Sequence, residues 1–178
     1  MTSPIDTLGM LDATLALPEQ IQSVLDSVGP IDGLPDPDRI EHVLILGMGD
    51  SGFGGDVAAA SARPFSSIPI VVYGGYLPPS WVGPSSLVIA ISASGTTEET
   101  LESLEAAVEA GASLVSVTAG GELEELTRHA HGPVLPVVDQ GPMPRTSLGS
   151  LAVPPMLALE QLGLFPVLVS GWLTPSIS

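Results

Sequence analysis

Short apolar runs alternate with longer segments of helical spacing along most of the chain. The runs are apolar at consecutive positions, which is typical of parallel strands covered by helices on both faces. We expect such strands at Val43–Leu46, Ile68–Tyr73, Leu87–Ile91, Leu114–Val117 and Val134–Val138. The pattern therefore predicts an α/β fold, with a doubly wound, mostly parallel sheet of about five strands.

The segments between these runs have the spacing of amphipathic helices. In the clearest, Thr97–Ala110, leucine and valine recur every three or four residues, and glutamates occupy the opposite face as a solvated surface. We expect further helices near Gly54–Ala62, Glu122–Ala130 and Leu148–Leu162. An earlier helix is expected over Leu11–Val28, where Gly29 and Pro30 end it.

The length of 178 residues suits one α/β domain and is too short for two full ones. We expect an N-terminal helical segment over residues 1–32, one domain over 33–165 and an apolar tail over 166–178. Because a large apolar stretch is rarely left in water, we also expect a second copy or a further segment to cover the tail.

Charge restricts the possible partners. The chain carries 4 basic and 20 acidic residues, a formal net charge of -16, so its field repels nucleic acid and anionic lipid. We therefore expect no nucleic-acid or membrane partner, and an anionic ligand would need local donors. The absence of cysteine and of a secretory signal favours the cytoplasm. No His, Asp and Glu cluster has metal-ligand spacing, so we expect neither a metal nor a cofactor.

The first candidate site is the glycine-rich segment Ile45–Asp56, which includes the end of the first expected strand. Its glycines allow a tight turn and let backbone N–H groups approach an anion at a helix N-terminus. Gly47, Gly49 and Gly52 also match the G-x-G-x-x-G fingerprint of dinucleotide-binding folds. A nicotinamide dinucleotide site needs an acidic residue at the end of the second strand, and Tyr73–Leu77 contains none. We therefore interpret the segment as an anion-binding loop.

The second candidate site is Ile91–Thr100, where the third expected strand runs into a helix. Four hydroxyl side chains around Gly95 supply neutral donors that could hold a phosphate without any lysine. They belong to Ser92, Ser94, Thr96 and Thr97. A capping box between Thr96 and Glu99 is the alternative, and it needs no ligand. The capping box leaves the two serines unexplained, so phosphate binding is the preferred interpretation.

The two loops, in this order and spacing, resemble the sugar isomerase (SIS) domain, which has a flavodoxin-like fold. Four motifs make the chain similar to the bifunctional phosphoglucose/phosphomannose isomerase family. They are the opening Ile5–Thr14, G-M-G-x-S-G from Gly47, S-x-S-G-x-T-E-E-T from Ser92 and P-R-x-x-L-G from Pro144. The resemblance runs over residues 5–165, nearly the whole chain.

The resemblance implies an isomerase that converts glucose 6-phosphate or mannose 6-phosphate to fructose 6-phosphate through an enediol intermediate. The residues it assigns to the phosphate are Gly49, Ser51, Gly52, Ser92, Ser94 and Thr97. It assigns the catalytic role to Arg145, whose guanidinium would stabilise the negative charge of the enediolate. An ion pair between Arg145 and Asp139 is the competing structural interpretation.

Members of that family have a second SIS domain, which supplies the general base and the residue for ring opening. We therefore expect this chain to stop before a second SIS domain and to supply half of a site, as a homodimer or with a complementary SIS-domain chain. A non-catalytic sugar-phosphate-binding or assembly module is the alternative, because the base is absent and Asp50 replaces a glycine beside Ser51. A structural relic that binds no ligand is a third interpretation.

Overall fold

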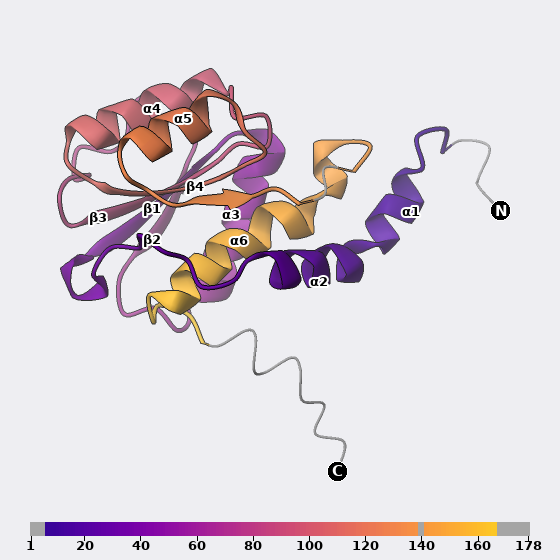
Figure 1. Ribbon diagram of the computed structural model, residues 1–178, viewed down its shortest axis with the longest axis horizontal. Coiled ribbons are helices and arrows are strands. Elements are labelled where there is room, and N and C mark those ends of the chain that lie inside the picture. Colours follow the sequence, from indigo (N-terminus) through magenta and orange to yellow (C-terminus); the bar gives the residue numbers. More distant parts are fainter. Residues whose placement is uncertain (1–5, 139–140, 167–178) are drawn as a thin grey trace, which may run out of the picture.

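The computed structural model describes residues 6–138 and 141–166 and has a five-stranded sheet at its centre (Figure 1). The strands are β1 His42–Gly47, β2 Ile70–Tyr73, β3 Ser86–Ile91, β4 Ser113–Thr118 and β5 Val134–Pro136. All neighbouring pairs are parallel, in the order β2-β1-β3-β4-β5, so the predicted doubly wound α/β fold is confirmed. The chain reverses direction across the sheet between β1 and β3, and ligands of such folds bind beyond that point.

Two layers of helices cover the sheet. Helices α3 Gly49–Ala62 and α6 Leu148–Gln161 lie on one face, and α4 Glu98–Glu109 and α5 Gly121–His129 lie on the other (Figure 1). Successive strand residues point to opposite layers: Ile45 packs in the α3–α6 core and Leu46 in the α4–α5 core. Both are almost completely buried. This two-sided burial explains why the strands read as unbroken apolar runs.

The expected helical structure over Leu11–Val28 is confirmed, but the structure divides it into two helices. Helix α1 Met10–Leu15 and helix α2 Leu17–Ser27 meet at Ala16, which lies outside both. Pro18 stands in the first turn of α2, and its ring would collide with a carbonyl of any helix continuing from before it. Helix α2 packs on α6, whereas α1 extends away from the body of the molecule (Figure 1).

Helix α3 begins at Gly49, well before the expected start near Gly54. Glycine disfavours helix, but here it allows close packing of the backbone. A Cβ at Gly52 would lie 2.7 Å from the carbonyl oxygen of Gly47, and one at Gly54 would lie 2.7 Å from Cβ of Leu151 on α6. The early helix start places the first turn of α3 directly beyond the end of β1.

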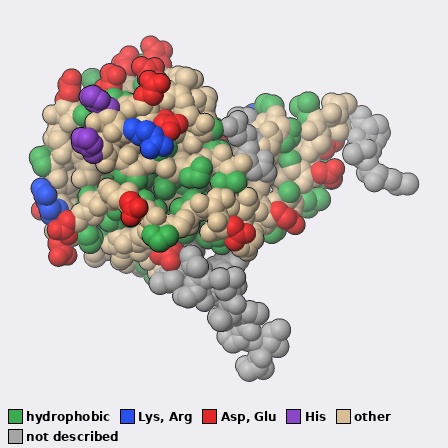
Figure 2. Space-filling view, in the orientation of Figure 1, with side chains coloured by type: hydrophobic (Ala, Val, Ile, Leu, Met, Phe, Trp, Pro, Cys, Tyr) green, Lys and Arg blue, Asp and Glu red, His purple; other side chains and the backbone are tan. Residues whose placement is uncertain are grey.

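Acidic side chains are spread over the visible face, and basic ones form only small patches (Figure 2). Among the described residues one ion pair is found, between Arg128 and Glu124 at 2.8 Å in α5. Two short 3-10 helices, η1 Pro37–Arg39 and η2 Pro144–Thr146, lie in the connections. In residues 6–138 and 141–166, no helix has the length and apolar character that crossing a membrane requires.

Replacing Gly54 with alanine tests the close packing of α3 on α6. The added methyl group would overlap Leu151, so we expect Gly54→Ala to lower the free energy of unfolding by about 1 to 3 kcal/mol. Urea denaturation followed by circular dichroism measures this change. Ala60→Ser, at an exposed position of the same helix, is the matched control and should change stability by less than about 0.5 kcal/mol. Equal effects of the two substitutions would contradict the packing argument.

Candidate functional site

The first loop joins β1 to α3 at the centre of the sheet. Met48 is the N-cap residue of α3 and its side chain makes no capping hydrogen bond. The amides of Ser51 and Gly52 donate to the Met48 carbonyl, at 3.1 and 3.3 Å. The amides of Gly49 and Asp50 have no hydrogen-bond partner in the part of the chain that the structure describes. Two N–H donors at the positive end of the helix dipole are therefore left for a ligand.

Two side chains of this loop differ in charge and are neighbours. Ser51 is half-buried, and its hydroxyl has no partner among the described residues. Asp50 is also half-buried and brings a carboxylate to the first turn of α3. An acid in the first turn is favourable to the helix dipole but competes with an anionic ligand for the same donors. The predicted serine is thus available, beside a charge that opposes phosphate.

The second loop joins β3 to α4, and its hydroxyl groups bond to one another. Ser92 is buried, and its Oγ lies 2.9 Å from Oγ1 of Thr97 and accepts the amide of Gly95 at 3.2 Å. Ser94 is exposed, and its Oγ accepts the amide and the hydroxyl of Thr96, at 3.3 and 3.2 Å. These bonds hold the four hydroxyl groups in a compact arrangement ahead of α4.

The alternative capping box between Thr96 and Glu99 does not form. Thr97, rather than Thr96, is the N-cap residue of α4, and its side chain makes no capping bond. The Thr96 hydroxyl is instead directed to Ser94. The amides of Glu98 and Glu99 therefore lack a hydrogen-bond partner within the described chain, as at the start of α3. Two helix N-termini without a side-chain cap thus face the same end of the sheet.

Gly95 fixes the path of the second loop. Its φ is 70°, in the left-handed region, and a Cβ there would overlap the carbonyl of Gly120. The Gly95 carbonyl in turn accepts the amide of Leu123 at 2.9 Å, in the first turn of α5. The loop is therefore held against the start of α5.

The loop after β2 brings a tyrosine close to the start of α4. The negative charges of Glu98 and then Glu99 raise the pKa of the exposed Tyr76 phenol. A Cβ at Gly74 in the same loop would lie 2.9 Å from Sδ of Met48 and 3.1 Å from the carbonyl oxygen of Gly47, so a side chain there would require Met48 to move. The surroundings of the two loops are thus acidic, and an anion bound there would depend on neutral donors and helix dipoles.

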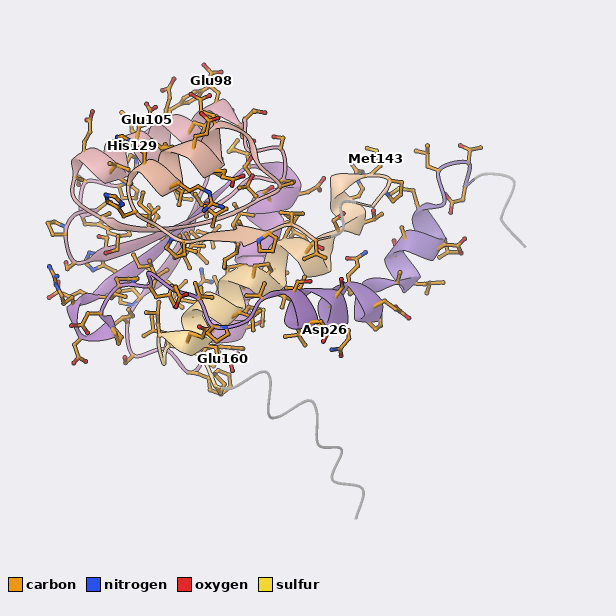
Figure 3. The ribbon with its side chains drawn as sticks, viewed as in Figure 1. Asp26, Glu98, Glu105, His129, Met143 and Glu160 are labelled. Carbon is orange, nitrogen blue, oxygen red and sulfur yellow. The ribbon has the colours of Figure 1, made fainter. Side chains whose placement is uncertain are left out.

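Arg145 lies on η2, between β5 and α6, in the segment that also carries Met143 (Figure 3). Its side chain is exposed. Helix η2 contacts α1 and α3, so Arg145 lies at the end of the sheet where the two loops lie. The competing partner, Asp139, is outside the described residues.

The structure brings most of the predicted residues to one place. Gly47 and Ile91 are register partners at the ends of β1 and β3, so the two loops that follow them are adjacent. Gly49, Ser51 and Gly52 come from one loop, and Ser92, Ser94 and Thr97 come from the other. Gly52 is buried against Gly47 and shapes the loop through backbone contact.

Sequence reasoning missed Gln20 of α2, which is 3% exposed and bonds to the segment beside Arg145. A signal was present, because Gln20 is four residues before the buried Val24 and so lies on the apolar side of the expected helix.

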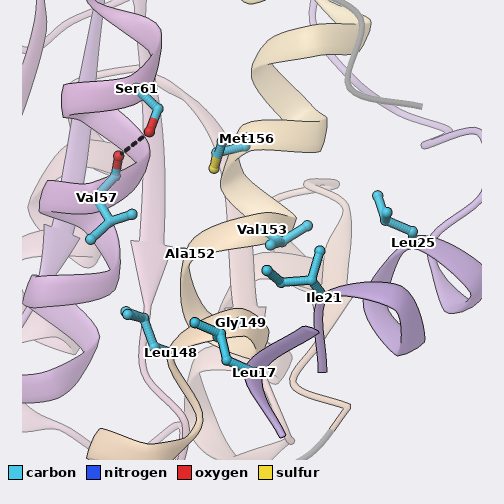
Figure 4. A pocket seen from close by; sticks show the side chains of 10 residues that line it. All are labelled: Leu17, Ile21, Leu25, Val57, Ser61, Leu148, Gly149, Ala152, Val153 and Met156. Atoms are coloured by element: carbon cyan, nitrogen blue, oxygen red, sulfur yellow. Dashed lines mark hydrogen bonds between the residues drawn. The ribbon is translucent and has the colours of Figure 1, made fainter. Parts of the chain in front are cut away.

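An apolar hollow lies elsewhere, between α2, α3 and α6 (Figure 4). It has a volume of about 200 Å³, and side chains such as Leu17, Ile21 and Met156 line it. A site for an anion needs converging polar groups, which this lining lacks. We therefore do not assign the hollow to the ligand of the two loops.

A family comparison agrees with this geometry. The SIS domain family model matches residues 39–136, which include all five strands and both loops. The chain belongs to the SIS domain family. The match begins before β1 and ends at the last residue of β5, so it covers the sheet and leaves out α2 and α6.

Proteins similar to this SIS domain chain include enzymes that are named for their sugar-phosphate substrates. The bifunctional phosphoglucose/phosphomannose isomerase of Caldicellulosiruptor bescii is 34% identical over 87% of this chain and 45% of its own length. The chain therefore spans less than half the length of that relative. The C-terminal domain of glucosamine-fructose-6-phosphate aminotransferase from Francisella tularensis superposes with a TM-score of 0.67, at 18% identity, over 89% of this chain and 50% of that one.

The NanR protein of Vibrio vulnificus, solved in complex with ManNAc-6P, superposes with a TM-score of 0.59 at 18% identity. The match covers 88% of this chain and 62% of that one. At such identities the two solved structures confirm the fold of this SIS domain and nothing finer.

The bonding of the second loop generates a stability test. Ser92→Ala removes the contact with Thr97 and one acceptor of the buried Gly95 amide, so we expect a loss of about 1 to 2 kcal/mol in the free energy of unfolding. Ser51→Ala is the control, since that hydroxyl has no partner among the described residues, and should change stability by less than about 0.5 kcal/mol. Urea denaturation measures both, and a destabilised Ser51→Ala would show that Ser51 has a structural role instead.

Proposed function

We propose that this chain supplies the phosphate-binding half of an aldose–ketose isomerase site. The reaction would convert glucose 6-phosphate or mannose 6-phosphate to fructose 6-phosphate through an enediol intermediate. The observation that carries the proposal is the pair of helix N-termini, of α3 and α4. No side chain caps their first amides, and hydroxyl groups lie nearby. Such ends bind phosphate through N–H groups and the helix dipole.

In the proposed complex the phosphate lies between the two loops. The Ser51 hydroxyl and the amides of Gly49 and Asp50 would donate from the start of α3. Ser92, Ser94 and Thr97 would donate from the other side after exchanging some of their mutual bonds for bonds to phosphate. Gly52 supports the site by letting the helix approach β1. Neutral donors suit a chain whose net charge of -16 would otherwise repel the ligand.

Arg145 is the proposed catalytic group of this half. Aldose–ketose exchange moves a proton between adjacent carbons, and negative charge develops on the enediolate oxygens between the two steps. A fixed guanidinium stabilises that charge most where water is partly excluded. The general base would come from a second SIS domain, as the resemblance implies, either in a second copy or in a complementary chain. The sugar-phosphate-binding domain would be residues 33–165, with the helices of residues 1–32 packed on it.

The relatives support this substrate class. The protein from Caldicellulosiruptor bescii is named for both isomerase activities, and the NanR protein of Vibrio vulnificus holds ManNAc-6P. A second candidate, a non-catalytic sugar-phosphate-binding module, is favoured by Asp50. Its carboxylate at the phosphate end would oppose the ligand by about 1 to 4 kcal/mol at close range.

Calorimetry with fructose 6-phosphate tests the binding half of the proposal. We expect the chain to bind and Ser51→Ala to weaken the affinity by about tenfold, the effect of one hydrogen bond to a charged ligand. Ser67→Ala is a matched control, because Ser67 is exposed in the connection that precedes β2, near the N-terminal ends of the parallel strands, whereas the two loops follow the C-terminal ends. No heat of binding when fructose 6-phosphate is added to the unaltered chain would contradict the proposal and favour a structural relic that binds no ligand.

A mimic of the enediolate tests the role of Arg145. A phosphorylated aldonate carries a carboxylate where the enediolate charge develops, so we expect Arg145→Gln to weaken its binding by about 10- to 100-fold. Binding of inorganic phosphate should change by less than about twofold, because the loops are intact. An isomerase assay of the same variants separates the two candidates: turnover that Arg145→Gln reduces favours the enzyme, and binding without turnover favours the module.

A further inference from the structure

Gln20 is a buried polar residue that connects the N-terminal helices to the segment carrying Arg145. It lies in the first turns of α2 and is 3% exposed. Leu17 and Ile21, near it on α2, lie beside Gly149 of α6 in the close view (Figure 4). A long amide side chain in such a place is costly unless its polar atoms find partners.

The Gln20 amide group is fully engaged. Its Nε2 donates to the carbonyl of Thr146 at 2.6 Å and to that of Ala13 at 3.3 Å. Its Oε1 accepts the amide of Gly149 at 3.3 Å. Thr146 directly follows Arg145, and Gly149 lies in the first turn of α6. One side chain therefore holds both ends of the turn that leads from η2 into α6.

This contact replaces a local helix cap. Ser147 is the N-cap residue of α6, yet its side chain makes no capping bond. Gln20, distant in sequence, accepts the orphan N–H of Gly149 in its place. Gly149 has no side chain at the point where α2 approaches, since a Cβ there would lie 2.9 Å from Cβ of Gln20.

The side chain of Arg145 has few contacts that could fix its orientation. Its side chain is exposed, and within residues 6–138 and 141–166 it takes part in no ion pair. The orientation of an exposed arginine follows from its backbone, because its own rotamers are free in water. The backbone of this turn is held by Gln20 on its C-terminal side. Within the turn, the amide and the hydroxyl of Thr146 donate to the Met143 carbonyl, at 2.9 and 2.7 Å.

We propose that Gln20 is a positioning residue, which holds the backbone at Thr146 and Gly149 so that Arg145 is presented to the sugar end of the site. The proposal rests on the proposed function for the role of Arg145, and on the structure alone for the contact. It assigns to the N-terminal helices a part in the chemistry that the SIS domain match, over residues 39–136, does not include.

The variants separate the two halves of the amide group. Gln20→Leu has a similar size and removes all three bonds. Gln20→Glu keeps the acceptor for Gly149 and loses the Nε2 donor to Thr146, and a protonated carboxyl group can restore one donor at lower pH. Gln22→Leu is the matched control, because Gln22 is exposed on the same helix and its Nε2 donates to a carboxylate oxygen of Asp26, at 2.8 Å.

The first measurement needs no activity. In a chain labelled with nitrogen-15, four arginine Nε–H signals are expected, and the one lost in Arg145→Lys identifies Arg145. We expect Gln20→Leu to shift that signal and to speed hydrogen exchange of the Gly149 amide by about tenfold, while Gln22→Leu changes neither. An unchanged Arg145 signal in a folded Gln20→Leu chain would overturn the proposal.

The second measurement reads the proposed function. We expect Gln20→Leu to weaken binding of the phosphorylated aldonate by about tenfold and to leave inorganic phosphate within about twofold. Combined with Arg145→Gln, it should cause no further loss, because it acts through that arginine. A merely structural role would weaken both ligands, or add to the loss in the double variant, and either result would overturn the proposal.

The remaining outcomes are also decisive. If Gln20→Leu does not fold, Gln20→Glu is compared at about pH 7.5 and 5.5. Return of the Arg145 signal to its position in the unaltered chain at the lower pH supports the positioning role of Gln20. An Arg145 signal that does not respond to either pH or substitution overturns it. If the unaltered chain binds neither ligand, the proposed function fails. The Arg145 signal and the hydrogen exchange of the Gly149 amide then still decide whether Gln20 positions Arg145.

Discussion

The close approach of α3 to its neighbours is the constraint on which the site depends. Added side chains at Gly52 and Gly54 would meet the Gly47 carbonyl and Leu151 at 2.7 Å, and one at Gly55 would meet Ile45 at 2.8 Å. Because these positions carry only hydrogen, the helix can begin immediately beyond β1 and point its first amides at the end of the sheet. The helix propensity lost at the glycines is offset by burial against the sheet and α6.

The acidity of the chain makes this geometry necessary for any anionic ligand. Four arginines and no lysine leave few positive charges to attract phosphate, and acidic residues lie in the first turns of both α3 and α4. Attraction must come from N–H groups and hydroxyl groups at short range, where their number and direction matter more than net charge. The N-termini of α3 and α4 supply such groups, and Arg145 adds one cation at the same end of the sheet.

Much of the fold and of the two loops could be predicted from the sequence, because they rest on local patterns. Consecutive apolar residues mark strands buried on both sides, and hydroxyl groups around Gly95 mark a strand-to-helix loop. The boundaries were less predictable. Helix α3 starts in a glycine run that propensity assigns to a loop, and Pro18 divides a periodic segment that pattern alone reads as continuous. The Thr96 capping box also fits the spacing, but Thr97 takes the cap position in the structure.

The sequence by itself determined the order of strands and helices, the parallel sheet and the two strand-to-helix loops, since each follows from periodicity, glycine and hydroxyl placement within a few residues. Only the tertiary structure decided which residues far apart in the sequence contact one another. The bonds from Gln20 to Thr146 and Gly149 join residues more than a hundred positions apart, and the meeting of Gly54 with Leu151 joins two helices. Such contacts depend on how layers pack, and no local pattern in the sequence records that packing.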